Sequence, residues 1–300
     1  MTTPTLHHIN CPNPATPGDP TPNATHRIGY WRWGDAAAPH VVLCVHGLTR
    51  QGRDFDVLAQ AIVARGAGRT QVLCVDVAGR GQSDWLPDPM GYQVPNYAMD
   101  MAQLIQTLQA KELDWVGTSM GGLIGMAVAS ALPVRRLVLN DVGPKLQWEA
   151  IVRIGTYVGM APRFPSVQAA ADAFWAISSG FGPHTPAQWL ALSAPMVRPM
   201  DDAQGGYAVH YDPAIGVPFR TVTREMAEQG EAMVWAAYDR ITARTLVLRG
   251  ALSDLLSRET AQEMGRRGPR ARVIEFAGVG HAPTLIASDQ QQAVLDFLFE

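Results

Sequence analysis

The sequence predicts an α/β fold with a doubly wound, mostly parallel sheet and one inserted helical lid. Short, continuously apolar runs, typical of strands buried on both faces of a parallel sheet, alternate with stretches of helical spacing. The alternation stops once, between residues 143 and 243, where helix-like stretches are broken by prolines and no buried strand is apparent. A strand–helix series with one such interruption indicates a single sheet that carries an inserted block.

The elements before the interruption follow in order. We expect strands at 28–33, 41–45, 71–77, 113–117 and 136–141, and helices at 56–64, 97–109 and 123–132. After the interruption we expect strands at 245–250 and 272–276 and helices at 259–267 and 290–299. The predicted division is an irregular N-terminal arm over 1–25, a core made of 26–142 and 244–300, and a helical lid over 143–243.

Composition excludes several classes of protein. A 300-residue chain with 47% hydrophobic and 17% charged residues is long enough for a large core, and its net charge of −3 gives no basic surface for nucleic acid. No apolar run is long enough to span a membrane. The proline-rich arm lacks the basic and apolar segments of a secretory signal, so we expect a cytoplasmic protein. Cys11, Cys44 and Cys74 have no metal-like spacing and are expected to be packed, reduced thiols.

A serine bracketed by glycines follows the expected strand at 113–117. The segment Gly117-Thr118-Ser119-Met120-Gly121 matches the pattern G-x-S-x-G, and a helix-compatible run begins directly after it. This pattern between a strand and a helix is the nucleophile elbow, in which a strained turn exposes the serine. Ser119 is therefore the candidate nucleophile.

Three further motifs lie after expected strands, where ligands of parallel sheets bind. They are the turn His46-Gly47-Leu48, the loop from Gly79 to Asp84, and the pair Gly280-His281. With the elbow, they make the chain resemble the α/β-hydrolase superfamily, in particular its capped, serine-dependent carboxylesterases, enol-lactonases and carbon–carbon bond hydrolases. The resemblance covers residues 28–142 and 244–300, and residues 143–243 take the place of the superfamily's cap.

The resemblance implies a Ser…Asp…His triad in chain order. His281 is the expected base, because the other histidines after the serine, His184 and His210, fall in the lid. Two carboxylates compete for the role of the acid. Asp254 follows the strand at 245–250 and matches the superfamily's usual position, so it is preferred. Asp141, which ends the strand before the lid, is the alternative.

The oxyanion hole is expected to consist of the backbone N–H groups of Leu48 and Met120. His46 is expected to hold the loop that carries Leu48. The pocket is expected to include Trp85, with Trp175 and Trp189 as further candidates from the lid. No motif for a nucleotide, zinc or a redox dithiol is present, so neither a cofactor nor a metal is expected.

These residues predict a serine hydrolase that cleaves carboxylic esters of small, largely apolar molecules through an acyl-enzyme intermediate. The alternative within enzymes is a carbon–carbon bond hydrolase or lactonase of aromatic catabolism. A non-catalytic ligand-binding protein of the same fold is disfavoured, because a binding site has no need of all three triad groups. The sequence leaves the oligomeric state open.

Overall fold

A computed structural model of the chain describes residues 3–14 and 24–300. Eight strands form the central sheet: β1 (Thr5–Pro12), β2 (Thr25–Trp33), β3 (His40–Val45), β4 (Thr70–Val75), β5 (Glu112–Thr118), β6 (Arg136–Asn140), β10 (Arg244–Gly250) and β11 (Arg272–Phe276). Their order is β1-β2-β4-β3-β5-β6-β10-β11. Neighbours from β4 to β11 run parallel, whereas β2 is antiparallel to both β1 and β4. The predicted, mostly parallel α/β fold is confirmed.

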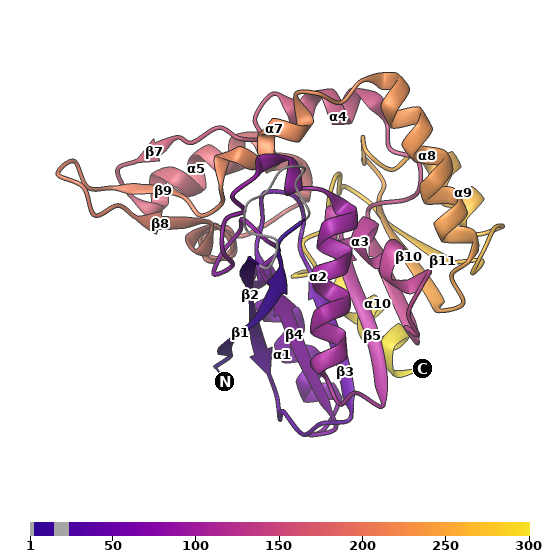
Figure 1. Cartoon of the computed structure of the whole chain (residues 1–300). Helices are drawn as coiled ribbons and strands as arrows, with labels where there is room; N and C mark the ends of the chain where they lie inside the picture. Colours follow the sequence, from indigo (N-terminus) through magenta and orange to yellow (C-terminus); the bar gives the residue numbers. More distant parts are fainter. Residues whose placement is uncertain (1–2, 15–23) are drawn as a thin grey trace.

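The sheet is buried between two layers of helices, which explains its apolar strands. Every residue of β3, β4 and β6 is buried. One face packs against α1 (Asp56–Arg65) and α10 (Ser288–Phe299), through residues such as Ile62 and Phe297. The other face packs against α2 (Val94–Thr107), α3 (Met120–Ala129) and α9 (Arg258–Met264), with Leu104 and Ile124 in its core. Figure 1 shows α2 and α3 in front of the sheet.

The N-terminal arm is not irregular throughout. Residues 5–12 form β1, which pairs along its whole length with β2. Inward-facing His7, Ile9 and Cys11 alternate with exposed neighbours, and Cys11 is fully buried against α2, where its thiol donates to the Asp100 carbonyl. The pairing satisfies the backbone of an edge segment whose composition alone indicated a loop. The rest of the expected arm, apart from residues 3, 4, 13, 14 and 24 and the first residue of β2, lies outside the described residues.

The inserted block contains a small sheet as well as helices. Its helices are α4 (Trp148–Gly155), α5 (Val167–Ser178), α6 (Pro186–Ser193), α7 (Gly216–Phe219) and α8 (Arg224–Asp239), and its strands are β7 (Arg163–Phe164), β8 (Val197–Pro199) and β9 (Tyr207–Val209). The strands form a three-stranded antiparallel sheet in the order β7-β9-β8. Strands of two or three residues are too short to give an alternating pattern, so the sequence did not indicate them.

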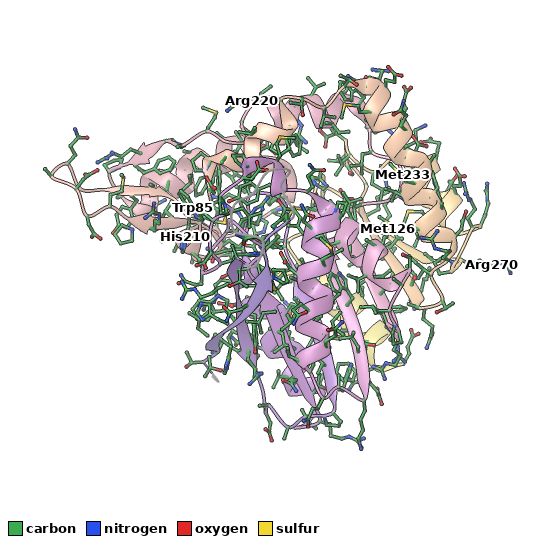
Figure 2. The ribbon with its side chains drawn as sticks, viewed as in Figure 1. Trp85, Met126, His210, Arg220, Met233 and Arg270 are labelled. Carbon is green, nitrogen blue, oxygen red and sulfur yellow. The ribbon has the colours of Figure 1, made fainter. Side chains whose placement is uncertain are left out.

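The last helix of the block, α8, belongs to the core layer. It packs beside α3, and its Trp235 and Tyr238 are buried in the main hydrophobic cluster. The Tyr238 hydroxyl also donates to the Met264 carbonyl at the end of α9. In Figure 2, Met126 lies on α3 and Met233 on α8; the first is fully buried and the second is exposed. The part of the block that projects from the core therefore ends before α8.

A main-chain bridge joins the middle of the block to the core. Gly81 N–H donates to the His210 carbonyl at 3.0 Å, and Asp212 N–H donates to the Gly79 carbonyl at 2.7 Å. These bonds flank an isolated β-bridge between Arg80 and Tyr211. The loop after β4 is thus attached to the inserted block far from both of the block's ends. Across residues 3–14 and 24–300, every helix is too short or too polar to cross a lipid bilayer.

Candidate active site

Ser119 occupies a strained turn between β5 and α3. Its backbone has φ 51° and ψ −115°, which residues other than glycine rarely adopt. Ser119 N–H donates to the Asn140 carbonyl on β6 at 3.0 Å, so the neighbouring strand holds the turn. The serine also immediately precedes the first residue of α3, whose N-terminal dipole points toward it.

The two glycines of the elbow are required by main-chain contacts. A Cβ on Gly117 would collide with the Gly121 carbonyl, and a Cβ on Gly121 would collide with the Val45 carbonyl. The nearest atoms in both cases belong to the main chain and not to the serine. The glycines allow α3 to start directly against β5 and β3, and this close approach brings Ser119 to the edge of the sheet.

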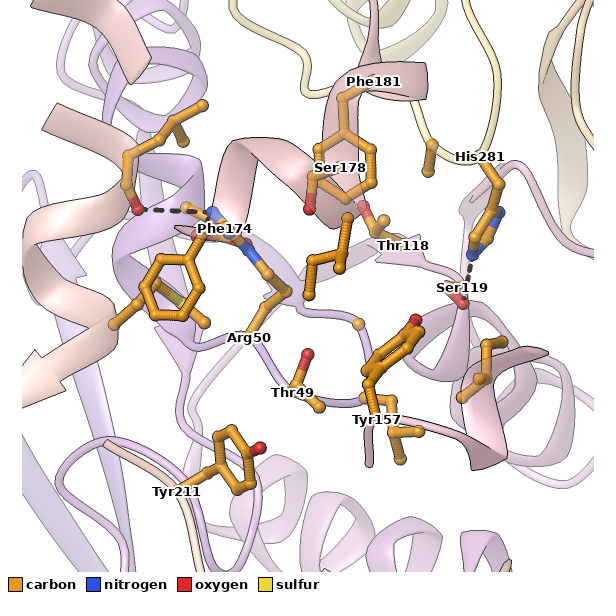
Figure 3. A pocket seen from close by; sticks show the side chains of 18 of the residues that line it. Thr49, Arg50, Thr118, Ser119, Tyr157, Phe174, Ser178, Phe181, Tyr211 and His281 are labelled. Atoms are coloured by element: carbon orange, nitrogen blue, oxygen red, sulfur yellow. Dashed lines mark hydrogen bonds and ion pairs between the residues drawn. The ribbon is translucent and has the colours of Figure 1, made fainter. Parts of the chain in front are cut away.

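His281 reaches Ser119 from the loop after β11. The Ser119 hydroxyl and His281 Nε2 are 3.0 Å apart (Figure 3), although 162 residues separate them in the sequence. The loop is fixed by Gly280 N–H, which donates to the Gly180 carbonyl of the inserted block at 2.5 Å. The imidazole is largely buried. The ring can accept the hydroxyl proton when its other nitrogen carries the N–H.

That other nitrogen faces Asp141. His281 Nδ1 lies 2.7 Å from Asp141 Oδ2, and the carboxylate is fully buried. Asp141 also accepts from the backbone N–H of Gly250 at 2.8 Å and from the hydroxyl of Ser253 at 2.6 Å. These two donors stabilise an ionised carboxylate in a buried position. They also orient Asp141, which ends β6, toward the histidine.

Asp254 does not contact His281, so the preference for it over Asp141 is corrected. Its side chain is 49% exposed and forms an ion pair with Arg153 of α4, with Arg153 Nε at 2.7 Å and Nη2 at 3.0 Å from its two oxygens. The turn after β10 directs Ser253 inward to Asp141 and leaves Asp254 outside. Chain order and strand ends favoured both carboxylates, and only the three-dimensional direction of the turn separates them.

The loop that carries Leu48 is held by His46. The neutral ring donates from Nδ1 to the Gly47 carbonyl at 2.7 Å and accepts from Val77 N–H at Nε2 at 3.0 Å. Burial lowers the pKa of His46 to about 3, so the ring stays neutral. Because the Gly47–Leu48 peptide is trans, fixing the Gly47 carbonyl directs the Leu48 N–H to the opposite side. His46 is therefore structural, as the sequence predicted.

The N–H groups of Leu48 and Met120 remain available. Neither donates a hydrogen bond within the described part of the chain. Leu48 lines the same pocket as Ser119, and Met120 begins α3 next to it. Two unpaired donors on adjacent loops are the arrangement that stabilises a developing oxyanion.

Arg80 supports this loop from inside the protein, a role that the sequence did not indicate. Its guanidinium is fully buried and donates to the Leu48 carbonyl at 2.9 Å, the Ala78 carbonyl at 2.6 Å and the Tyr97 hydroxyl at 2.9 Å. Burial of a charge requires such a set of acceptors. Arg80 thus fixes the carbonyl of the peptide that follows the Leu48 N–H.

A pocket of about 310 Å³ opens onto Ser119 and His281 (Figure 3). The inserted block supplies much of its wall, including Ile154, Tyr157, Met160, Phe174, Phe181 and Met196. Most of the lining is apolar, and Arg50, Asp54 and Arg153 are its charged members. The pocket therefore suits a small, mainly apolar molecule with a few polar groups.

The tryptophans expected in the pocket lie elsewhere, and that expectation is corrected. Trp85 is exposed, with the guanidinium of Arg198 above its ring. Trp189 is buried in a separate cluster of the block, and its ring N–H donates to the Ala171 carbonyl. Trp175 packs edge-on against Trp189, with ring centroids 5.0 Å apart. Phe174, one position earlier on α5, faces the pocket instead, because successive helix residues point about 100° apart.

Sequence comparison identifies relatives along almost the whole chain. The alpha/beta hydrolase family matches residues 42–297. A 3-hydroxybutyrate-oligomer hydrolase of Cupriavidus necator is 47% identical over 286 residues, which cover 94% of each chain. A 2-(acetamidomethylene)succinate hydrolase of Mesorhizobium japonicum is 27% identical over 244 residues, or 80% of this chain and 81% of the relative.

Solved structures show the same similarity. The crystal structure of an alpha/beta hydrolase from Novosphingobium aromaticivorans superposes with a TM-score of 0.82 and 32% identity, covering 99% of both chains. The relatives are hydrolases. The superposition covers 99% of the chain, and the family match covers the parallel part of the sheet from residue 42 onward, the inserted block and the loops that carry Ser119 and His281. The chain therefore belongs to the alpha/beta hydrolase family.

Proposed function

We propose that this hydrolase cleaves carboxylic esters through an acyl-enzyme on Ser119. The observation that carries the proposal is the continuous hydrogen-bonded series Ser119–His281–Asp141, which opens into an apolar pocket beside two unpaired backbone N–H groups. A nucleophile, a base, an orienting carboxylate and an oxyanion site are the groups that acyl transfer needs. In this proposal Asp141, and not Asp254, is the acid.

The reaction follows from these contacts. His281 Nε2 takes the proton of Ser119 as the Oγ attacks the ester carbonyl, and Asp141 stabilises the imidazolium through Nδ1–H. The N–H groups of Leu48 and Met120 receive the negative oxygen of the tetrahedral intermediate, each contributing about 3 kcal/mol to lowering the barrier. The imidazolium then protonates the leaving alcohol. Water, deprotonated by His281, hydrolyses the acyl-serine by the same steps.

The inserted block is proposed to be a cap that selects the substrate. Phe174, Phe181 and Tyr157 line the pocket, so they would contact the acyl or alcohol part of an ester. By covering Ser119 they would also exclude water and strengthen the polar interactions at the reacting carbonyl.

We propose short hydroxyacid esters, such as 3-hydroxybutyrate oligomers, as the substrate class. The 47% identity to the Cupriavidus necator hydrolase over 94% of both chains supports this assignment. The pocket supports it as well, because its apolar wall with a few charged side chains suits chains that alternate methyl groups with ester oxygens.

The test is a set of hydrolysis assays on purified protein. The 3-hydroxybutyrate dimer and trimer should be cleaved to the monomer, and a fluorophosphonate should add its mass to Ser119 and abolish the activity. Ser119→Ala is the matched control. This variant should neither cleave the oligomers nor gain the mass of the fluorophosphonate. If only vinylogous 1,5-diketones were turned over, the ester assignment would be wrong. If lactones were turned over and the linear esters were not, ester cleavage would stand but the proposed substrate class would be wrong. If the wild-type protein did not react with the fluorophosphonate, the proposed mechanism would be wrong.

A further inference from the structure

The pocket wall contains an ion pair that the triad does not use. Arg50 Nε and Nη2 each donate to one oxygen of Asp54 at 2.6 Å. The two side chains are only 11% and 19% exposed, and both line the pocket. A charged pair is costly to keep in a largely apolar cavity, so a pair at this position calls for a functional explanation.

The pair lies close to the nucleophile. A Cβ placed on Gly47 would stand 3.7 Å from Ser119 Cβ and 3.8 Å from Arg50 Cγ, so the Arg50 side chain and Ser119 flank the same glycine. Arg50 N–H donates to the Gly47 carbonyl, which closes the turn that carries Leu48. Figure 3 shows Arg50 and Ser119 in the wall of the same pocket.

Both partners keep unused hydrogen-bonding capacity. Besides its two bonds to Asp54, Arg50 donates once more, from Nη2 to the Leu192 carbonyl at 3.3 Å. Its Nη1 makes no hydrogen bond within the described residues. Each oxygen of Asp54 accepts a single side-chain bond and can accept another. The pair therefore has a free donor on Arg50 and open acceptor positions on Asp54, at separate points because Nη1 is opposite the edge that Asp54 occupies.

The charges of the pair decide what can bind there. Asp54 neutralises Arg50, so a second carboxylate would gain from the guanidinium but be repelled by Asp54. A hydroxyl group meets neither penalty, because it is uncharged and can either donate to an open oxygen position of the carboxylate or accept from Nη1. A plain alkyl chain in the same place would remove water from both groups and replace none of its hydrogen bonds.

We propose that Arg50 and Asp54 bind the free hydroxyl group of a hydroxyacyl chain, and so make the enzyme selective for hydroxyacyl esters over unsubstituted acyl esters. The inference rests on the proposed ester hydrolysis and adds the residues that recognise the substrate. The pair takes no part in bond cleavage. Its contribution is to the binding of the acyl chain in the ground state and in the transition state alike.

Three esters with the same leaving group and four acyl carbons test the proposal: p-nitrophenyl 3-hydroxybutyrate, p-nitrophenyl butyrate and the p-nitrophenyl monoester of succinate. The wild-type enzyme should have a kcat/KM at least about tenfold higher for the hydroxy ester than for butyrate, because a site built for a hydroxyl discriminates against its absence. The succinate ester should be the poorest of the three.

Asp54→Asn and Arg50→Met should each lower kcat/KM for the hydroxy ester more than for butyrate, so that the preference falls about tenfold toward unity. A matched control exists on the same segment. Arg53 and Asp56 form an ion pair of the same type that does not line the pocket, so Asp56→Asn should leave the preference of the wild-type enzyme unchanged.

The outcomes separate the two proposals. Equal kcat/KM values for the hydroxy and butyrate esters in the wild-type enzyme overturn this inference and leave ester hydrolysis intact. The same holds if the succinate ester is the best substrate, since the pair would then be an anion site. Hydrolysis of none of the three overturns the proposed function and this inference with it. An unchanged preference in a folded Asp54→Asn or Arg50→Met variant also overturns this inference, and either variant decides if the other fails to fold.

Discussion

Ser253 donates a hydrogen bond to Asp141 at 2.6 Å, so the turn that follows β10 supports the carboxylate that ends β6. The sequence indicated this turn as the source of the acid, through Asp254. The turn instead supplies two donors, the Ser253 hydroxyl and the Gly250 N–H, to a carboxylate on the neighbouring strand. Such donors satisfy the buried carboxylate and hold it in the orientation that faces His281.

The first prediction compares the two aspartates. Asp141→Asn should lower kcat by about 10⁴, because an amide cannot fix the imidazole tautomer that His281 needs. Asp254→Asn should change kcat less than about threefold, since it only breaks a solvent-exposed ion pair with Arg153. Parallel assays on one ester give the ranking. A larger loss for Asp254→Asn would return the acid to the position that the sequence favoured.

The second prediction concerns the nucleophile. Ser119→Ala should reduce ester hydrolysis by several orders of magnitude and leave the fold intact, because the removed hydroxyl contributes only its bond to His281. Circular dichroism and thermal unfolding provide the control for folding. Activity above about a hundredth of the wild-type value would contradict the role of Ser119.

The third prediction uses two adjacent residues of α5. Phe174→Ala should change the ratio of rates for short and long acyl esters, because Phe174 lines the pocket. Trp175→Ala should leave that ratio unchanged, because Trp175 packs against Trp189 outside the pocket. The measurement is kcat/KM over a series of p-nitrophenyl esters. Equal changes in both variants would mean that the cap acts through its stability and not through direct contact.

The fourth prediction is a pH dependence of stability caused by His46. Burial lowers the pKa of His46 from 6.5 to about 3. Between these values the unfolded chain binds a proton that the native protein does not, so the contribution is complete above pH 6.5 and is lost as the pH falls. The loss amounts to about 1.4 kcal/mol per pH unit.

His46→Asn removes this proton and should flatten the acid side of the profile. Between pH 7 and pH 5, its free energy of unfolding should fall by about 2 kcal/mol less than that of the wild-type protein. Urea unfolding at the two pH values measures the difference. The other histidines are present in both proteins and cancel. Parallel losses in the two proteins would mean that His46 is protonated in the native state.

The sequence predicted the elements that carry Ser119, His281 and Leu48 because their signals are local. Buried parallel strands give continuous apolar runs, and the loops after them contain glycines wherever the main chain must approach closely. The fold follows from these runs alone. The pairing of Ser119 with His281 follows from chain order, since a single histidine after the serine lies at a strand end.

The remaining features depend on directions that the sequence does not encode locally. Asp141 and Asp254 both follow strands, and the path of one turn decides between them. Trp175 and Phe174 are both large apolar residues that could line a pocket. The orientation of α5 about its axis places Phe174 in the pocket and Trp175 outside it. The sequence did not predict β1, because the alternating residues His7, Ile9 and Cys11 are only partly apolar and prolines surround the segment. Its backbone pairing with β2 holds this segment in the sheet, although its composition is not typical of a strand.

The main-chain bridge between the loop after β4 and the inserted block limits how this block can be replaced by the corresponding block of a relative. In a chimera cut only at the two ends of the block, Gly79 and Gly81 would bond to the foreign main chain only if it followed the path of residues 210–212. The Tyr92 hydroxyl, which donates to Asp212 at 2.5 Å, would lose its acceptor as well. A functional transplant must therefore take residues 79–92 from the donor of the cap, so that the unit of exchange is discontinuous in the sequence.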